Sequence, residues 1–160
     1  MPTTAFLVDP AELADRPLAF DIEAIRKIIP QRFEMEQLSG VWFCDVERGL
    51  AAGFKRVRDD EFWVRGHLPG RPLLPGVMML EAAAQLSAVL YHVALGERAA
   101  PFIGYAGLED VRFRGTVEPG ARLDLFARVR ALKPRLAVFE TQGAVGDRLV
   151  FEAVVKGVPV

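Results

Sequence analysis

Two side chains suited to proton transfer lie on either side of a loop rich in proline and glycine. His67 is the residue type best matched to proton transfer near neutral pH. Glu81 is a carboxyl in an otherwise oily stretch, where it suits a proton donor. Gly76 follows Pro75, and a helix beginning there would offer a backbone N–H and its positive dipole end to a developing oxyanion. Together these groups describe abstraction of a proton next to a carbonyl, coupled to loss of a leaving group.

Structural roles for the polar residues stay open at this point. A histidine in such a loop is often only hydrogen-bonded, and a buried Glu81 could bond a backbone group across the core. Gln85 could form a hydrogen bond within the core. His92 is expected to be structural, near the C-terminal end of a helix, and Cys44 to be a small residue of the core or sheet. The sequence contains no phosphate-binding loop and no Ser-His-Asp hydrolase signature.

The stretch from Val77 to Leu95 is apolar on nearly every side and predicts a buried helix about 28 Å long. A membrane span of this length is the alternative, but it would place Glu81 and Gln85 in hydrocarbon at high cost. We therefore expect a core helix in a protein that does not enter a membrane. Its spacing puts Glu81, Gln85, Ala88 and His92 near one stripe.

The remaining elements predict an α+β fold. A helix is expected from Ile22 to Ile29, capped by Asp21 and stopped by Pro30. A β-hairpin is expected over 37–57, followed by a solvated turn at Asp59-Asp60-Glu61. Further strands are expected near 102–114, 121–132, 135–145 and 148–157. Short connections favour antiparallel pairing, so we predict a curved sheet of about six strands around the one long helix.

Length and composition limit the number of domains and the classes of partner that this chain is expected to have. The 160 residues suit a single domain over residues 19–160, with residues 1–18 as an N-terminal extension. A formal net charge of -1 argues against a general nucleic-acid binder. Cys44 is the only cysteine, which excludes an internal disulfide and a cysteine-based zinc site and fits a reducing compartment. The first twenty residues lack the pattern of a secretory signal, so we expect a cytoplasmic protein.

One long motif resembles a known family. The stretch HLPGRPLLPGV, from His67 to Val77, is followed by Glu81-Ala82 and then Gln85. It closely resembles the signature of the FabZ/FabA-type 3-hydroxyacyl-[acyl-carrier-protein] dehydratases, which reads His-Phe-Pro-Gly-x-Pro-x-x-Pro-Gly-Val and then Glu-Ala-x-x-Gln. Segments 21–30 and 111–120 are also similar, and the likeness covers roughly residues 20–157.

The resemblance implies the hotdog fold and at least a homodimer, or a trimer of dimers, with active sites at the subunit interface. His67 would be the catalytic histidine, and Glu81 the catalytic carboxylate that reaches the His67 of the other subunit. Gly76 would donate its N–H to the thioester carbonyl, and Gln85 would support Glu81. The expected substrate-binding residues are Pro75, Gly76, Val77 and Gln85.

The implied reaction is reversible dehydration of a (3R)-3-hydroxyacyl thioester to the trans-2-enoyl thioester, in fatty-acid or related lipid or polyketide synthesis. His67 would take the C2 proton and Glu81 would protonate the leaving hydroxyl, without a metal or redox cofactor. Glu rather than Asp at position 81 resembles the FabZ branch. The implied partner is an acidic acyl carrier protein, whose phosphopantetheine arm holds the substrate. Candidate docking residues, which could equally be ordinary solvated arginines, are Arg65, Arg71, Arg112, Arg114 and Arg122.

One segment departs from the family. Where the family usually has His-Arg-Tyr-Pro-Phe, this chain has Gln31-Arg32-Phe33-Glu34-Met35. Because this segment borders the substrate entrance in the family, the acyl chain length and the carrier are open. Two other functions on the same fold also stay open, an acyl thioesterase and a non-catalytic acyl-binding subunit. The intact pair of His67 and Glu81 disfavours both.

Overall fold

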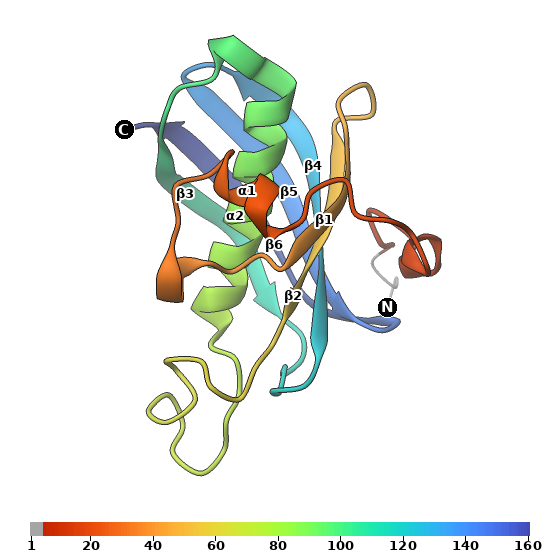
Figure 1. Cartoon of the computed structure of the whole chain (residues 1–160), viewed down its shortest axis with the longest axis vertical. Helices are drawn as coiled ribbons and strands as arrows, with labels where there is room; N and C mark the ends of the chain where they lie inside the picture. The colour runs from red at the N-terminus through yellow and green to blue at the C-terminus, as the bar shows by residue number, and fades with distance from the viewer. Residues whose placement is uncertain (1–4) are drawn as a thin grey trace.

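The computed structural model describes residues 5–160 and contains a six-stranded antiparallel sheet that wraps around one long helix (Figure 1). The strand order is β1-β2-β4-β5-β6-β3, so β1 and β3 are the two edges. The predicted α+β hotdog architecture is confirmed, and all six strands fall where the sequence predicts them. The strands are β1 (Gly40–Asp45), β2 (Leu50–Arg56), β3 (Ile103–Phe113), β4 (Arg122–Lys133), β5 (Leu136–Val145) and β6 (Arg148–Pro159).

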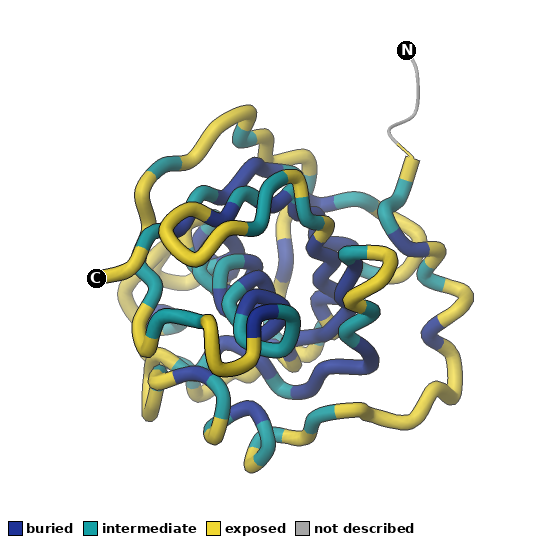
Figure 2. Tube along the Cα trace, turned by 90° about the horizontal axis from the view of Figure 1, so that it is seen from above, coloured by how far each residue is buried: buried dark blue, intermediate teal, exposed yellow. Residues whose placement is uncertain are grey.

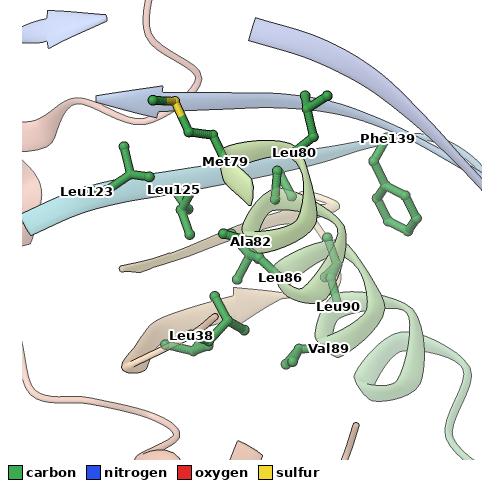
Figure 3. Packing of buried hydrophobic residues seen from close by; sticks show 14 of the residues in the cluster. Leu38, Met79, Leu80, Ala82, Leu86, Val89, Leu90, Leu123, Leu125 and Phe139 are labelled. Carbon is green, nitrogen blue, oxygen red and sulfur yellow. The ribbon is translucent and has the colours of Figure 1, made fainter. Parts of the chain in front are cut away.

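The long helix α2 (Gly76–Leu95) forms the centre of the main core. Its alanines and leucines are strong helix formers, and Gly96, with φ of 55°, ends it. Figure 3 shows Leu86 and Leu90 of α2 among side chains from the sheet, such as Leu125 and Phe139. The helix is long and apolar enough to cross a membrane, but here most of its large apolar side chains are buried in the main core. Seen from above, α2 lies in the middle, and the exposed residues gather in the surrounding loops (Figure 2).

A second apolar cluster, the outer cluster, lies on the opposite face of the sheet. Residues 5–18 contribute Val8 and Leu13 to it and cover its sheet residues, with one 3-10 turn, η1 (Pro10–Leu13), capped by the Asp9 carboxylate. The Gln142 side chain fixes this segment, because it accepts a hydrogen bond from the N–H of Leu7 and donates one to the carbonyl of Ala5. The outer cluster consists of Val8, Leu13, Trp42, Phe43, Leu50, Ala52, Phe54, Phe126 and Ala144.

The short helix α1 (Ile22–Arg26) ends three residues earlier than predicted. Asp21 caps it as expected, by accepting a hydrogen bond from the N–H of Ala24. Beyond its end, the Arg32 guanidinium donates to the carbonyls of Arg26 and Ile29, acceptors that the end of the helix leaves open. Two further 3-10 turns are η2 (Phe33–Met35) and η3 (Gly96–Arg98).

Candidate active site

Glu81 lines a cavity of about 170 Å³ between α2 and the β6–β3 edge of the sheet. Gln85 and Ala88 follow Glu81 along one face of the helix and line the same cavity, as the predicted stripe requires. His92, the fourth residue of that stripe, lies outside the cavity, and partial burial lowers its pKa. The full lining is Gln31, Glu81, Ala84, Gln85, Ser87, Ala88, Ile103, Gly104, Tyr105, Phe139, Val155, Lys156 and Gly157.

Gln85 holds the Glu81 carboxylate in place. Its Nε2 donates to Glu81 Oε1 at 2.8 Å and to the carbonyl of Met35 at 2.7 Å. Its Oε1 accepts a hydrogen bond from the N–H of Gln37 at 3.0 Å. One buried amide therefore orients the carboxylate and ties the segment after η2 to the central helix. These contacts combine the two roles that the sequence left open for Gln85, a core hydrogen bond and support of Glu81.

Tyr105 stands beside Glu81 at the free edge of the sheet. Its hydroxyl donates to the carbonyl of Leu80 at 2.7 Å. Burial of the hydroxyl and the nearby Glu81 carboxylate raise the pKa of Tyr105, so the phenol stays protonated at neutral pH. Sequence reasoning did not find this residue, because a tyrosine in a strand usually reports only β propensity.

Gln31 closes the cavity from the segment that departs from the family motif. Its Oε1 atom is buried and has no hydrogen-bond partner among residues 5–160. A buried acceptor without a donor costs about 1–3 kcal/mol of folding free energy.

His67 lies in the long loop between β2 and α2, which projects from one end of the molecule (Figure 1). The side chain is exposed, and its backbone N–H donates to the carbonyl of Trp63 at 2.9 Å. Trp63 and Leu74 are buried in the main core and anchor the two ends of the loop. His67 does not line the Glu81 cavity, so one chain does not bring the two predicted catalytic residues together.

A buried ion pair fixes the base of this loop to the sheet. Lys55 Nζ on β2 lies 2.5 Å from Glu61 Oε1, and the two side chains are only 3% and 6% exposed. Glu61 Oε2 also accepts a hydrogen bond from the N–H of Arg58. The expectation of a solvated turn at 59–61 is therefore wrong for Glu61, because a lysine from the neighbouring strand draws its carboxylate inward. Burial lowers the pKa of Lys55, while the Glu61 carboxylate opposes this shift.

Gly76 is the first residue of α2, so its N–H is one of the four that a helix leaves without an internal partner. The Phe113 ring packs against it so closely that a Cβ atom at Gly76 would lie 2.8 Å from the ring. Pro75 is buried and supplies the carbonyl that accepts the N–H groups of the first helical turn, whereas the Val77 side chain is exposed. The four expected substrate-binding residues thus occupy two places, three at the start of α2 and Gln85 in the cavity.

The candidate docking arginines separate into two groups. Arg122 pairs with Asp124, and Arg114 pairs with Glu152. Within residues 5–160, Arg65, Arg71 and Arg112 make no ion pair, and all three are exposed. Arg65 and Arg71 lie in the same loop as His67, one on each side of it in the sequence, while Arg112 lies on β3.

Comparison with known proteins decides the family. The family model for the FabA-like domain matches residues 29–154. The chain belongs to the FabA-like family. Within it, the chain is 35% identical over 134 residues to a 3-hydroxyacyl-[acyl-carrier-protein] dehydratase FabZ from Pelotomaculum thermopropionicum, covering 83% of this chain and 94% of the relative. It is 31% identical over 136 residues to a protein of the same name from Novosphingobium aromaticivorans, covering 84% and 85%.

Solved structures share the fold of this FabA-like chain. The dehydratase heterocomplex ApeI:P from Xenorhabdus doucetiae superposes with a TM-score of 0.73 at 17% identity, covering 85% of this chain and 90% of the other. Cj0977, a sigma28-regulated virulence protein from Campylobacter jejuni, gives a TM-score of 0.65 at 15% identity, covering 92% and 96%. At identities of 15% and 17% these superpositions support the fold alone, so the chemistry is argued from the residues of the site.

Proposed function

We propose that this protein is a (3R)-3-hydroxyacyl-[acyl-carrier-protein] dehydratase of the FabZ type. The observation that carries the proposal is the Glu81 carboxylate, which lines a cavity and is oriented by Gln85, in a chain of the FabA-like family that keeps the loop with His67. A carboxyl that lines a cavity and is held by an amide is suited to protonate a leaving hydroxyl.

In the proposed reaction His67 removes the proton from C2 of the thioester, whose carbonyl accepts a hydrogen bond from the N–H of Gly76. The C2–H electron pair forms the C2–C3 double bond as the C3–O bond breaks. Glu81 protonates the departing hydroxyl, which leaves as water. Return of the proton from His67 to Glu81 through solvent completes the cycle. Because both proton transfers use side chains of the protein, the chemistry needs no metal or redox cofactor.

We propose that the active site forms between two copies of the chain. Within residues 5–160 the edge strand β3 pairs only with β6, and no strand of this part of the chain pairs with its other edge. A long free edge with exposed apolar side chains is a template for pairing with another strand. Glu81 and Tyr105 line a cavity at this same edge, so a second copy docked there would approach Glu81 with its own His67 loop. The exposed apolar side chains along this edge are Phe102, Tyr105, Leu108 and Phe113.

The proposed partner is an acyl carrier protein, and the proposed location is the cytoplasm. Arg65 and Arg71 are exposed, make no ion pair with residues 5–160 and lie within four residues of His67 in the same loop, so they can meet an acidic carrier where its phosphopantetheine arm enters. Docking by charge predicts that KM for the carrier-bound substrate rises steeply with salt, while KM for a small thioester does not.

Turnover of (3R)-3-hydroxyacyl thioesters on carrier protein and on coenzyme A tests the function, with enoyl absorbance and free thiol followed together. The proposal expects enoyl product, and loss of turnover in both His67→Ala and Glu81→Gln. Release of free thiol would indicate a thioesterase. Absence of both products from the folded protein would indicate a non-catalytic acyl-binding subunit.

A further inference from the structure

The turn η2 presents an aromatic ring to solvent. Phe33 is 86% exposed, the highest fraction among the large apolar side chains of residues 5–160. Its φ of 55° lies in the left-handed region, which aspartate tolerates but a bulky side chain adopts only at a cost. Neither feature stabilises the single chain, and a contact with another molecule would account for both.

Hydrogen bonds and an ion pair hold the turn that carries this ring. The carbonyl of Met35 accepts a hydrogen bond from Gln85 Nε2 at 2.7 Å, and the N–H of Gln37 donates to Gln85 Oε1 at 3.0 Å. The Glu36 carboxylate pairs with the Arg26 guanidinium at two points, with distances of 2.7 and 2.9 Å. An aromatic side chain on a backbone fixed in this way loses little conformational entropy when a partner binds it, which is typical of an interface anchor.

The same contacts place Phe33 beside the proposed shared edge. Gln85 joins the carbonyl of Met35 to the Glu81 carboxylate, and Phe33 precedes Met35 by two residues, which span at most about 7 Å. On its other side, Gln31 lines the Glu81 cavity together with residues of β3. In Figure 1, η2 is drawn in orange and stands at the outside of the molecule on the side of β3.

The loop that carries His67 has an apolar side chain to match this surface. Leu68 follows His67 directly and is 42% exposed, while Met35, beside the Phe33 ring in η2, is 44% exposed. When His67 of a second copy lies against Glu81, Leu68 of that copy lies one residue, about 3.8 Å, further along the chain. Apolar side chains of the two copies then face each other, and two-fold symmetry produces the contact twice.

We propose that Phe33 anchors a second copy of the chain by packing against Leu68 of that copy, and so positions its His67 opposite Glu81. This inference rests on the proposed active site between two copies. Phe33 is a positioning residue in this arrangement, because it acts on the loop of the second copy and does not touch the reacting atoms.

A second copy fits the surface around Phe33 better than an acidic carrier protein does. The charged residues on either side of the ring, Arg32 and Glu34, have opposite signs, so their net charge does not attract an acidic partner. The ring is also continuous, through the contacts of η2, with the cavity at the β3 edge where the second copy docks.

Sedimentation equilibrium over a dilution series tests the anchor. Phe33→Ala should raise the Kd of the dimer about a hundredfold, which is about tenfold for each of the two symmetric contacts. Phe33→Tyr keeps the ring and should keep the wild-type Kd. Val46→Ala is the control, because Val46 is 49% exposed on the turn between β1 and β2, and it should leave the Kd unchanged. An unchanged Kd in Phe33→Ala, with the circular dichroism spectrum of wild type, would overturn the proposal, and a monomeric wild-type protein would overturn it together with the shared site.

Steady-state kinetics at concentrations that keep Phe33→Ala dimeric test the positioning of His67. For a small 3-hydroxyacyl thioester, kcat should fall about tenfold with little change in KM, because His67 of the second copy is held less precisely. An unchanged kcat would overturn the positioning role. A higher KM for the carrier-bound substrate alone, with an unchanged Kd of the dimer, would assign the ring to the carrier and overturn the proposal. A wild-type dimer that depends on Phe33 but turns over no hydroxyacyl thioester would support the anchor and refute the dehydratase function.

Discussion

Replacement of Lys55 by methionine removes one half of the buried ion pair at the base of the loop that carries His67. Methionine keeps the length of the lysine stem but carries no charge, so Glu61 is left buried without its cation. Breaking a buried pair in this way costs about 3–5 kcal/mol, because the remaining charge has lost its compensation. We therefore expect Lys55→Met to lower the free energy of unfolding by about that amount.

The double variant Lys55→Met with Glu61→Leu removes both charges and so measures the energetic coupling between the two residues. Two apolar side chains of similar volume avoid the desolvation penalty, so the double variant should unfold within about 1 kcal/mol of wild type. Glu61→Leu alone leaves the lysine charge uncompensated and should be destabilised, like Lys55→Met. Arg58→Met, a change at an exposed residue of the same turn, serves as the control and should stay within about 0.5 kcal/mol.

Urea unfolding at one fixed protein concentration, followed by intrinsic fluorescence, measures these differences. The reasoning fails if Lys55→Met costs less than about 1 kcal/mol, since the pair would then behave like a surface contact. It also fails if the double variant is as unstable as either single variant, because the two side chains would then not be coupled.

Three further predictions concern other parts of the chain. Removal of residues 1–18 uncovers the apolar outer cluster but leaves the main core complete, so the protein should stay folded, bind ANS, and lose about 3 kcal/mol in urea unfolding. Gly76→Ala should change the free energy of unfolding by less than about 1 kcal/mol, because the Phe113 ring beside it is exposed and can move aside. Steady-state kinetics should nevertheless show slower turnover, because the added methyl group crowds the bound thioester. Burial raises the pKa of the Cys44 thiol to about 12. In native protein at pH 8 this thiol should therefore react with DTNB about a thousandfold more slowly than a free thiol. In protein unfolded by urea it should react at the rate of a free thiol.

The fold could be predicted because the spacing of apolar residues along the sequence distinguishes helices from strands. The oily run over 77–95 is too long for a strand and too polar at Glu81 for a membrane span, which leaves the central helix. The outer cluster was missed, although the run Val41-Trp42-Phe43 carries a signal for it. Adjacent residues in a strand point to opposite faces, so the pair Val41-Trp42 indicates that both faces are buried, and a register shift between Val41 and Phe43 then places Phe43 in the outer cluster beside Trp42.

The features of the site that sequence reasoning missed depend on contacts between distant segments. Glu61 looks solvated within its acidic turn, and only the neighbouring strand supplies the lysine that buries it. Tyr105 comes beside Glu81 through the pairing of β3 with β6, which no local pattern fixes. The motif from His67 to Gln85 names the candidate residues, whereas their separation within one chain becomes visible only in three dimensions.

Mixing two inactive variants tests the proposed shared active site most directly. His67→Ala and Glu81→Gln subunits, unfolded together in urea and refolded, would form heterodimers in which one of the two sites keeps both wild-type residues. With random pairing, half of the dimers are mixed, so enoyl-forming activity should recover to about a quarter of wild type. Activity that stays at the level of the separate variants, with mixed dimers demonstrated by mass spectrometry, would contradict an active site built from two subunits.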